Sequence, residues 1–124
     1  MNLHVRLTPQ IIPCIDDNKD LLECEKSFLE SFGYTVLTAP SGGKGLEVAF
    51  IHSVDVVIIV DYFMPEMNGQ EVAIEMRRLR RQAPIIMLSG RVEVPQALNS
   101  VDAFIAKDRL ASQLLIAIVQ LEEC

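Results

Sequence analysis

The stretch VDVVIIVDYFMPEMNG, residues 54–69, decides the fold of this chain. Its first half is apolar and β-branched at nearly every position, which is typical of a parallel strand buried on both faces. The apolar run stops at Asp61, and the turn formers Pro65, Asn68 and Gly69 follow it. The pattern predicts a central strand over 54–60 with a carboxylate at its end.

Shorter units of the same kind lie on either side of this strand. Apolar runs alternate with segments of helical period, an order that is typical of successive β-α units. The expected strands are residues 11–15, 34–39, 54–60, 84–88 and 103–106. The expected helices follow Asp17, Ser41 and Gly69, with a short or irregular one near 94–99 and a last one over 110–121. We therefore expect an α/β fold, a doubly wound parallel sheet of five strands with helices on both faces.

The apolar positions also predict which side of each helix faces the sheet. We expect inward-facing residues at Leu21, Cys24, Phe28 and Phe32 in the first helix, at Leu46, Ala49 and Phe50 in the second, and at Val72, Met76 and Leu79 in the third. Pro13 falls inside the first strand, where its missing N–H predicts a local distortion or an unpaired stretch. The last helix is apolar nearly all round, so it is either deeply buried or exposes part of its surface to a partner.

The composition argues against several classes of protein. The 124 residues include 17 acidic and 11 basic ones, for a net charge of −6, and no basic run is long enough to follow a nucleic-acid backbone. No apolar run is long enough to cross a bilayer, so we expect a cytoplasmic protein with no membrane association. We interpret the three cysteines as reduced thiols, with Cys14 and Cys24 packed in the core. We expect residues 1–10 to be an N-terminal lead and residues 11–122 to form one domain, with no effector domain present.

Polar side chains follow four of the five expected strands, at the point where each strand ends. Asp16 and Asp17 follow the first strand, Asp61 the third, Ser89 the fourth and Lys107 the fifth. The carboxyl ends of parallel strands meet at one edge of such a sheet, where ligands bind. The sequence therefore predicts a site with three carboxylates, a hydroxyl and an ammonium.

The chemistry of these side chains indicates phosphoryl transfer with a metal ion. Three carboxylates close together repel one another unless a cation lies among them, and hard oxygen ligands without His or Cys favour Mg²⁺ or Mn²⁺ over Zn²⁺. A strand-end carboxylate beside such an ion can attack a phosphoryl donor and form an acyl phosphate. Lys107 would neutralise charge on the transferred group, and Ser89 would donate a hydrogen bond to one of its oxygens.

These residues and their spacing resemble the receiver domain of response regulators in two-component signalling, over residues 11–121. The match covers the acidic pair, the phosphoacceptor with its Met-Pro…Gly loop, the hydroxyl residue with a small neighbour, the lysine and the switch aromatic. In this chain they are Asp16-Asp17, residues 61–69, Ser89-Gly90, Lys107 and Phe104. The resemblance implies a flavodoxin-like sheet with strand order 2-1-3-4-5.

The resemblance also implies a reaction. Asp61 would accept a phosphoryl group from a histidine kinase or a phosphotransfer protein in a magnesium-dependent step. The backbone carbonyl of Phe63 would join Asp16, Asp17 and Asp61 as a metal ligand. Such a protein is mainly a switch, and whether its intrinsic Mg²⁺-dependent autophosphorylation and autodephosphorylation make it an enzyme stays open.

The output of the switch follows from the same resemblance. Phosphorylation would draw Ser89 toward the phosphoryl group and let Phe104 turn inward. This would remodel the face formed by the helix near 94–99, the strand 103–106 and the helix 110–121. The remodelled face would bind an unknown downstream protein or a second copy of the chain.

Three features depart from the family pattern. Ser89 and Lys107 are 18 positions apart, about one helical turn fewer than is usual, so the helix between them must be short or irregular. Asp108 stands where the family commonly has a cis-proline, which predicts a different shape for that loop. Phe63 and Arg91 occupy positions that tune the loss of the phosphoryl group, and both side chains are large enough to hinder attacking water.

Two other functions stay open at this point. A pseudo-receiver would use the same fold to bind a partner or dimerise without phosphorylation, and the shortened segment before Lys107 and the presence of Asp108 keep this alternative open. A hydrolase of the haloacid dehalogenase type also uses a strand-end Asp nucleophile. That group has a second Asp two residues later, where this chain has Phe63, which argues against a hydrolase.

Overall fold

The centre of the protein is a sheet of five parallel strands. The computed structural model describes residues 10–52, 56–79, 82–90 and 100–122. The strands are β1 Ile11–Ile15, β2 Thr35–Ala39, β3 Ile58–Asp61, β4 Ile85–Ser89 and β5 Ala103–Ala106. They pair in the order β2-β1-β3-β4-β5, and each pair is parallel. The predicted fold class and strand order are confirmed.

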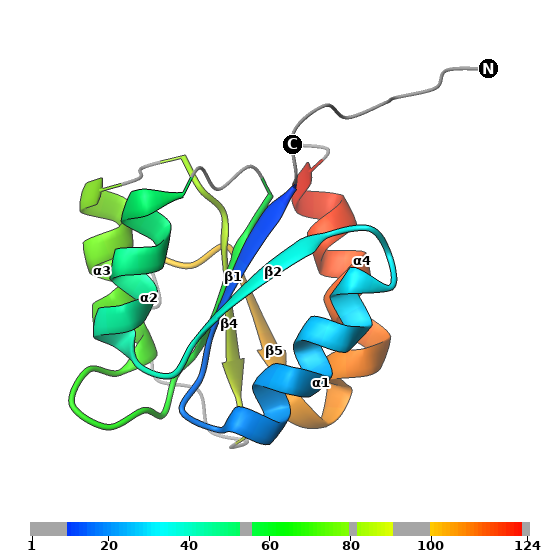
Figure 1. The fold of residues 1–124 in the computed structure, drawn as a ribbon, viewed down its shortest axis with the longest axis horizontal. Coiled ribbons are helices and arrows are strands. Elements are labelled where there is room, and N and C mark those ends of the chain that lie inside the picture. The colour runs from blue at the N-terminus through cyan, green and yellow to red at the C-terminus, as the bar shows by residue number, and fades with distance from the viewer. Residues whose placement is uncertain (1–9, 53–55, 80–81, 91–99, 123–124) are drawn as a thin grey trace.

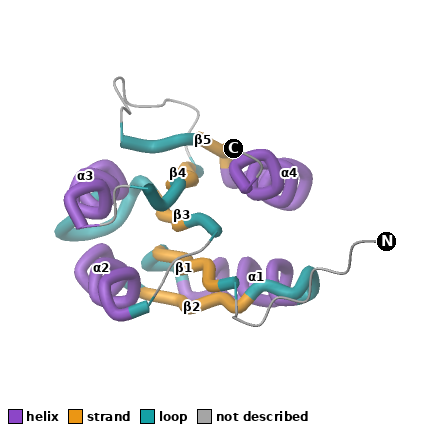
Figure 2. Tube along the Cα trace, turned by 90° about the horizontal axis from the view of Figure 1, so that it is seen from above, coloured by secondary structure: helices purple, strands orange, loops and turns teal. Residues whose placement is uncertain are grey.

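Helices cover both faces of this sheet. They are α1 Lys19–Glu30, α2 Gly42–Ile51, α3 Gly69–Leu79 and α4 Leu110–Glu122, with a 3-10 turn, Lys107–Arg109, in front of α4. Seen from above, α2 and α3 lie on one side of the sheet, and α1 and α4 lie on the other (Figure 2). None of the described helices is long and apolar enough to span a bilayer. The helix predicted near 94–99 and the predicted start of the central strand at 54 and 55 lie outside the described part of the chain.

All five strands run in one direction, so their carboxyl ends lie at one edge of the sheet (Figure 1). The register keeps these ends level. Asp61, the last residue of β3, pairs with Leu88, and Ser89, the last residue of β4, pairs with Ala106. The polar residues at the strand ends are thereby brought to a common height, as the sequence predicts.

Apolar side chains fill the space between the sheet and each helical layer. On the side of α1 and α4, buried residues of those helices, such as Leu29 and Leu114, pack on the sheet. On the side of α2 and α3, Val72 and Met76 belong to the second cluster. Every residue of β3 and β4 is buried, which explains why these strands are continuously apolar in the sequence up to their polar last residues.

The predicted inward face of α1 is only partly right, since Phe28 packs against the core but Cys24 and Phe32 do not. The buried residues of this helix are Leu22, Glu25 and Leu29. Cys24 is exposed, and Phe32, beyond the helix end, is 52% exposed, so neither packs in the core. The buried face lies one position further along the helix than predicted, and it includes a charged residue, Glu25, which a search for apolar residues does not find.

Two further residues predicted to face inward do not. Phe50 in α2 is 68% exposed, and Leu79 in α3 is 49% exposed. Helix α2 instead packs through small residues, since Gly42, Gly45 and Ala49 are its buried ones. A Cβ atom at Gly45 would lie 2.3 Å from Cδ1 of Ile15, so the helix approaches the sheet more closely than a larger side chain allows.

Pro13 lies in β1 just before the residues that pair with β3. It pairs with Leu37 of β2, whereas the first pair between β1 and β3 is Cys14 with Ile59. The carbonyl of Gln10 and the N–H of Asp16 bond to β2, so by alternation Pro13 directs its nitrogen toward β3. The missing N–H therefore falls where pairing with β3 has not yet begun, as the predicted unpaired stretch requires.

Arg77 ties the end of α3 to the starts of two strands. Its Nε donates to the carbonyl of Ser100 at 3.0 Å and its Nη1 to the carbonyl of Ala83 at 2.7 Å. Its Nη2 pairs with the carboxylate of Asp102, which also accepts from the N–H of Ile85 at 2.8 Å. This network, hereafter the Arg77 clamp, fixes where β4 and β5 begin.

Removal of the Asp102 carboxylate tests the clamp. We expect Asp102→Ala to lower the free energy of unfolding by about 1–3 kcal/mol, because the Ile85 N–H and the guanidinium of Arg77 lose a charged acceptor. Urea unfolding followed by circular dichroism measures this, with Asp108→Ala, an exposed acid in the 3-10 turn, as the matched control. Equal unfolding midpoints for the two variants would contradict a stabilising role for the clamp.

Candidate functional site

Three carboxylates meet at the carboxyl edge of the sheet. Asp16 and Asp17 follow β1, and Asp61 ends β3. One oxygen from each of them lies within 4.8 Å of the others. Asp16 and Asp61 are buried, whereas Asp17 is exposed. The structure thus brings together the three acids that the sequence singles out.

Backbone contacts hold Asp16 in place. Its N–H donates to the carbonyl of Ala39 at 3.1 Å, which continues the pairing of β1 with β2. Its Oδ1 accepts from the N–H of Asn18 at 2.9 Å, and Asn18 caps α1 by accepting from the N–H of Leu21 at 3.1 Å. The start of α1 is therefore fixed to the carboxylate of Asp16, whose second oxygen is left for the site.

The loop after Asp61 is pressed against the strand end. The N–H of Gly69 donates to the carbonyl of Tyr62 at 2.8 Å, and a Cβ at Gly69 would lie 2.5 Å from the carbonyl oxygen of Asp61. Asn68 and Glu71 form a reciprocal capping box: Asn68 Oδ1 accepts from the N–H of Glu71 at 2.9 Å, and Glu71 Oε1 accepts from the N–H of Asn68 at 3.0 Å. This cap was not anticipated from the sequence, although its residue types and spacing are visible there.

Lys107 bridges two of the acids. Its Nζ lies 3.0 Å from Oδ2 of Asp16 and 3.0 Å from Oδ1 of Asp61. Both contacts are ion pairs between opposite charges. The lysine follows β5 directly, whereas the acids follow β1 and β3, so three strands contribute to one charge cluster.

Burial and the neighbouring charges shift the pKa values of this pair. Burial raises the pKa of Asp61 to about 6, the contact with Lys107 opposes this rise, and the negative charges of Asp16 and Asp17 add to it. Burial lowers the pKa of Lys107, but its contacts with Asp61 and Asp16 outweigh burial, so the net shift is upward. Lys107 therefore stays charged at neutral pH, where Asp61 is mostly ionised.

The other predicted residues lie around this centre. Ser89 is fully buried at the end of β4, and its pairing with Ala106 puts it one position from Lys107 in the ladder. Phe63 is 36% exposed, and its ring packs edge to face on Tyr62, with centroids 4.6 Å apart. Phe104 is half-buried on β5.

One buried charged residue near the site was missed. Glu25, on the inward face of α1, is 2% exposed, and its Oε2 has no hydrogen-bond partner among the described residues. Burial raises the pKa of Glu25 to about 8, the charge of Asp16 adds to this rise, and Lys107 opposes it. The burial of Glu25 could have been predicted from Leu22 and Leu29, which lie three positions before it and four positions after it on the same side of α1.

The donor set at this edge fits a small divalent cation. The ligand atoms are carboxylate oxygens, which Mg²⁺ prefers, and they are close enough to share one ion. Two of the buried oxygens, Oδ2 of Asp16 and Oδ1 of Asp61, have no hydrogen-bond partner among the described residues, and the ammonium of Lys107 lies beside both. Their negative charge is therefore only partly compensated by the protein.

Comparison with known families identifies the group to which the chain belongs. The family model of the response regulator receiver domain matches residues 12–119. The chain belongs to this family. Receiver domains are modules of two-component signalling by phosphorylation, so the predicted family and signalling class are confirmed.

Individual relatives agree with this assignment. Transcriptional regulatory protein GlrR of Escherichia coli is 36% identical over 90 residues, which cover 73% of this chain and 20% of that protein. Response regulator SaeR of Staphylococcus aureus is 29% identical over 79 residues, 64% of this chain and 34% of that protein. The receiver domain therefore matches only a fifth to a third of the length of these curated relatives.

A solved relative shows the same fold with a ligand. Response regulator TrrA of Thermotoga maritima, crystallised with Mg²⁺ and BeF, is 28% identical, with a TM-score of 0.83 over 90% of this chain and 98% of that chain. TrrA has also been crystallised with the histidine kinase ThkA, with a TM-score of 0.81 to this receiver domain.

Gly69 offers a direct test of how the site is positioned. In Gly69→Ala the new methyl group would collide with the Asp61 carbonyl, so either the strand end or the start of α3 must move. We expect a loss of about 1–3 kcal/mol in unfolding free energy and chemical-shift changes at Asp61 and Tyr62. Gly43→Ala is the matched control, because a Cβ at Gly43 would meet no atom of the described residues within 4 Å. If the two variants behave alike, the close approach of Gly69 does not position Asp61.

Proposed function

We propose that Asp61 is the phosphoacceptor of a signalling switch and takes its phosphoryl group from the phosphohistidine of a kinase or phosphotransfer protein. The observation that supports this most strongly is the ion-pair bridge of Lys107 to Asp16 and Asp61 at the strand edge. The carboxylate of Asp61 is buried, its backbone is fixed by pairing with β4, and a positive charge lies beside it. These are the conditions that a carboxylate nucleophile needs toward a phosphoryl donor.

The side chains divide the work of the transfer. A carboxylate oxygen of Asp61 forms a bond to phosphorus while the P–N bond to the donor imidazole breaks, and the imidazole keeps the electron pair and takes up a proton. Lys107 neutralises charge on the phosphoryl oxygens. The hydroxyl of Ser89, which lies one ladder position from Lys107, donates a hydrogen bond to a phosphoryl oxygen after the transfer.

Asp16, Asp17 and Asp61, with the backbone carbonyl of Phe63, would hold Mg²⁺. The fit of the three carboxylates supports this assignment, as does the Mg²⁺ in the crystals of the relative TrrA. When bound, the ion would offset the charges of the acids and of the incoming phosphoryl group. In the described structure Lys107 already compensates part of that charge.

The phosphoacceptor role is tested by direct labelling. Incubation with acetyl phosphate and Mg²⁺ should add about 80 Da, the mass of one phosphoryl group, to the intact protein. We expect the adduct to vanish in Asp61→Asn, because an amide is not a nucleophile here, and to persist in Asp20→Asn. Asp20 is the matched control, an exposed acid in the first turn of α1.

The outcome also decides the alternative. A pseudo-receiver binds its partner without phosphorylation, and it predicts no adduct and no spectral response to beryllofluoride with Mg²⁺. An adduct that survives Asp61→Asn would place the acceptor elsewhere and overturn the proposed role.

We propose in addition that a second copy of the chain binds to the face of β5 and α4. In α4, Ile116 is 59% exposed and Val119 is 42% exposed, so this helix is only partly buried. Residues 110–121 of this helix include no charged residue, in a chain of net charge −6. A charge-free apolar face lets two acidic copies approach one another without direct repulsion.

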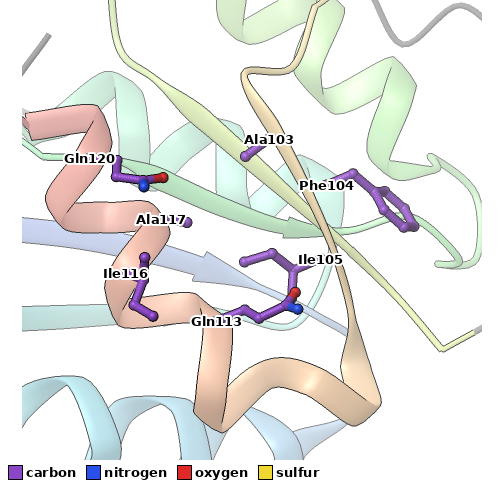
Figure 3. A pocket seen from close by; sticks show the side chains of 7 residues that line it. All are labelled: Ala103, Phe104, Ile105, Gln113, Ile116, Ala117 and Gln120. Carbon is purple, nitrogen blue, oxygen red and sulfur yellow. The ribbon is translucent and has the colours of Figure 1, made fainter.

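A hollow of about 250 Å³ lies on this face between β5 and α4. Ile105 and Ala103 of β5 point toward α4 there, and Ile116, Gln113 and Gln120 line the helix side (Figure 3). The ring of Phe104 points away from α4 (Figure 3). The proposed switch residue thus lies next to the proposed interface, and a change in its position would alter the shape of the hollow's strand wall.

Light scattering tests the interface. We expect the apparent mass to rise from 13.9 kDa toward twice that value with concentration, and more readily with beryllofluoride and Mg²⁺. Ile116→Asp should keep the protein monomeric, because it buries a charge in the contact. Ile74→Asp, at an exposed apolar position of α3, should not. A wild-type protein that stays monomeric under all conditions would leave this face to a different downstream protein.

A further inference from the structure

Glu25 is a carboxyl group whose burial has no structural explanation. It lies on the inward face of α1 between Leu22 and Leu29, which belong to the apolar cluster on that side of the sheet. Its side chain is almost completely shielded from water, and Oε2 has no partner among the described residues. A buried polar group without a hydrogen bond destabilises a protein, so a leucine would suit this core position better.

The surroundings of Glu25 connect it to the acid site. The groups that influence it electrostatically are Asp16, Lys107 and Asp61, in that order, and Glu25 in turn acts on the thiol of Cys14. None of the hydrogen bonds or ion pairs within the described ranges joins Glu25 to the three aspartates. Helix α1 packs on β1 and β2, and β2 carries no charged residue. The coupling therefore acts through space, across a poorly solvated interior.

The remaining charges near α1 do not compensate Glu25. Residues 110–121 of α4, on the same side of the sheet, include no charged residue. Asp17, Asp108 and Arg109 are exposed to solvent, which screens them. Lys26, the neighbour of Glu25 on α1, is engaged at the surface with Glu30 at 3.5 Å. Lys107 is the cation that acts on Glu25, and it is shared with two aspartates.

We propose that Glu25 is a buried proton-binding residue coupled to the acid site, which holds a proton when no divalent cation is bound and releases it to solvent when the cation binds. The inference rests on the proposed cation site at Asp16, Asp17 and Asp61. A dipositive ion there adds positive charge close to a group that is surrounded by low-dielectric protein, and this favours the carboxylate form of Glu25. Linkage makes the effect reciprocal, so ionised Glu25 strengthens cation binding.

The sign of the pH dependence follows. Without the cation the pKa of Glu25 is about 8, so the residue is mostly protonated at pH 7. Protonated Glu25 contributes no negative charge, and cation affinity is then lower. The affinity should rise as pH increases through the window of about 7 to 9 and level off above it. Asp61, with a pKa of about 6, titrates below this window, so the two contributions are separable.

The proposal is tested by NMR of ¹³C,¹⁵N-labelled protein, in which the side-chain carboxyl signal of Glu25 is assigned through its bonds to the backbone of the same residue. The side-chain carboxyl of Glu25 should titrate near pH 8 without Mg²⁺, and saturating Mg²⁺ should lower its pKa by about one unit or more, the usual effect of a nearby opposite charge. A Glu25 signal that titrates in the ordinary range, or that does not move when Mg²⁺ shifts the ring signals of Tyr62 and Phe63, overturns the proposal. Absence of any Mg²⁺ effect on those ring signals refutes the cation site itself, and the proposal with it.

Cation affinity gives a second, independent measurement. Mg²⁺ titrations followed through the Tyr62 ring should show affinity rising roughly fivefold from pH 7 to pH 9 for a one-unit shift. Glu25→Gln, which mimics the protonated form, should lose this dependence, whereas Glu23→Gln, an exposed acid on the same helix, should keep it. An unchanged pH profile in Glu25→Gln overturns the coupling. If that variant does not fold, the ¹³C titration of the wild-type protein decides alone.

Discussion

The ammonium of Lys107 between two buried carboxylates is the interaction on which the rest of the site depends. Two acids side by side in the interior are strongly unfavourable unless a positive charge is fixed beside them. Lys107 supplies that charge at 3.0 Å from each. It reaches them because β1, β3 and β5, which are far apart in the chain, end at one edge of a level parallel sheet. The charges of Asp16 and Asp61 are therefore compensated only if the strands keep this order and this register.

The strand ends were predictable from the sequence because they combine two strong signals, a short apolar run and a polar residue that stops it. Asp16, Asp61, Ser89 and Lys107 all lie where this reasoning places them. The helix faces were less predictable, for two physical reasons. A charged residue, Glu25, takes a core position in α1, and glycines form the contact surface of α2. Patterns of large apolar residues are blind to both arrangements.

The helical layers on the two faces of the sheet differ in how they contribute to the acid site. On the side of α2 and α3, Gly69 and the Asn68–Glu71 cap hold the loop after Asp61 rigidly in place. On the side of α1 and α4, the interior contains an uncompensated carboxyl group and the surface contains an uncovered apolar helix face. The first layer positions the loop that follows Asp61. The second contains Glu25, whose raised pKa reflects its burial and the charges of the site.

The Arg77 clamp has an implication for how such a domain diversifies. It anchors the starts of β4 and β5 from α3, while the site anchors their ends. The peptide that connects β4 with β5 therefore leaves from one fastened point and returns to another, and Lys107 keeps its place whatever that peptide contains. Because both of its ends are fastened, we expect this segment to accept changes of sequence or length with little effect on the fold.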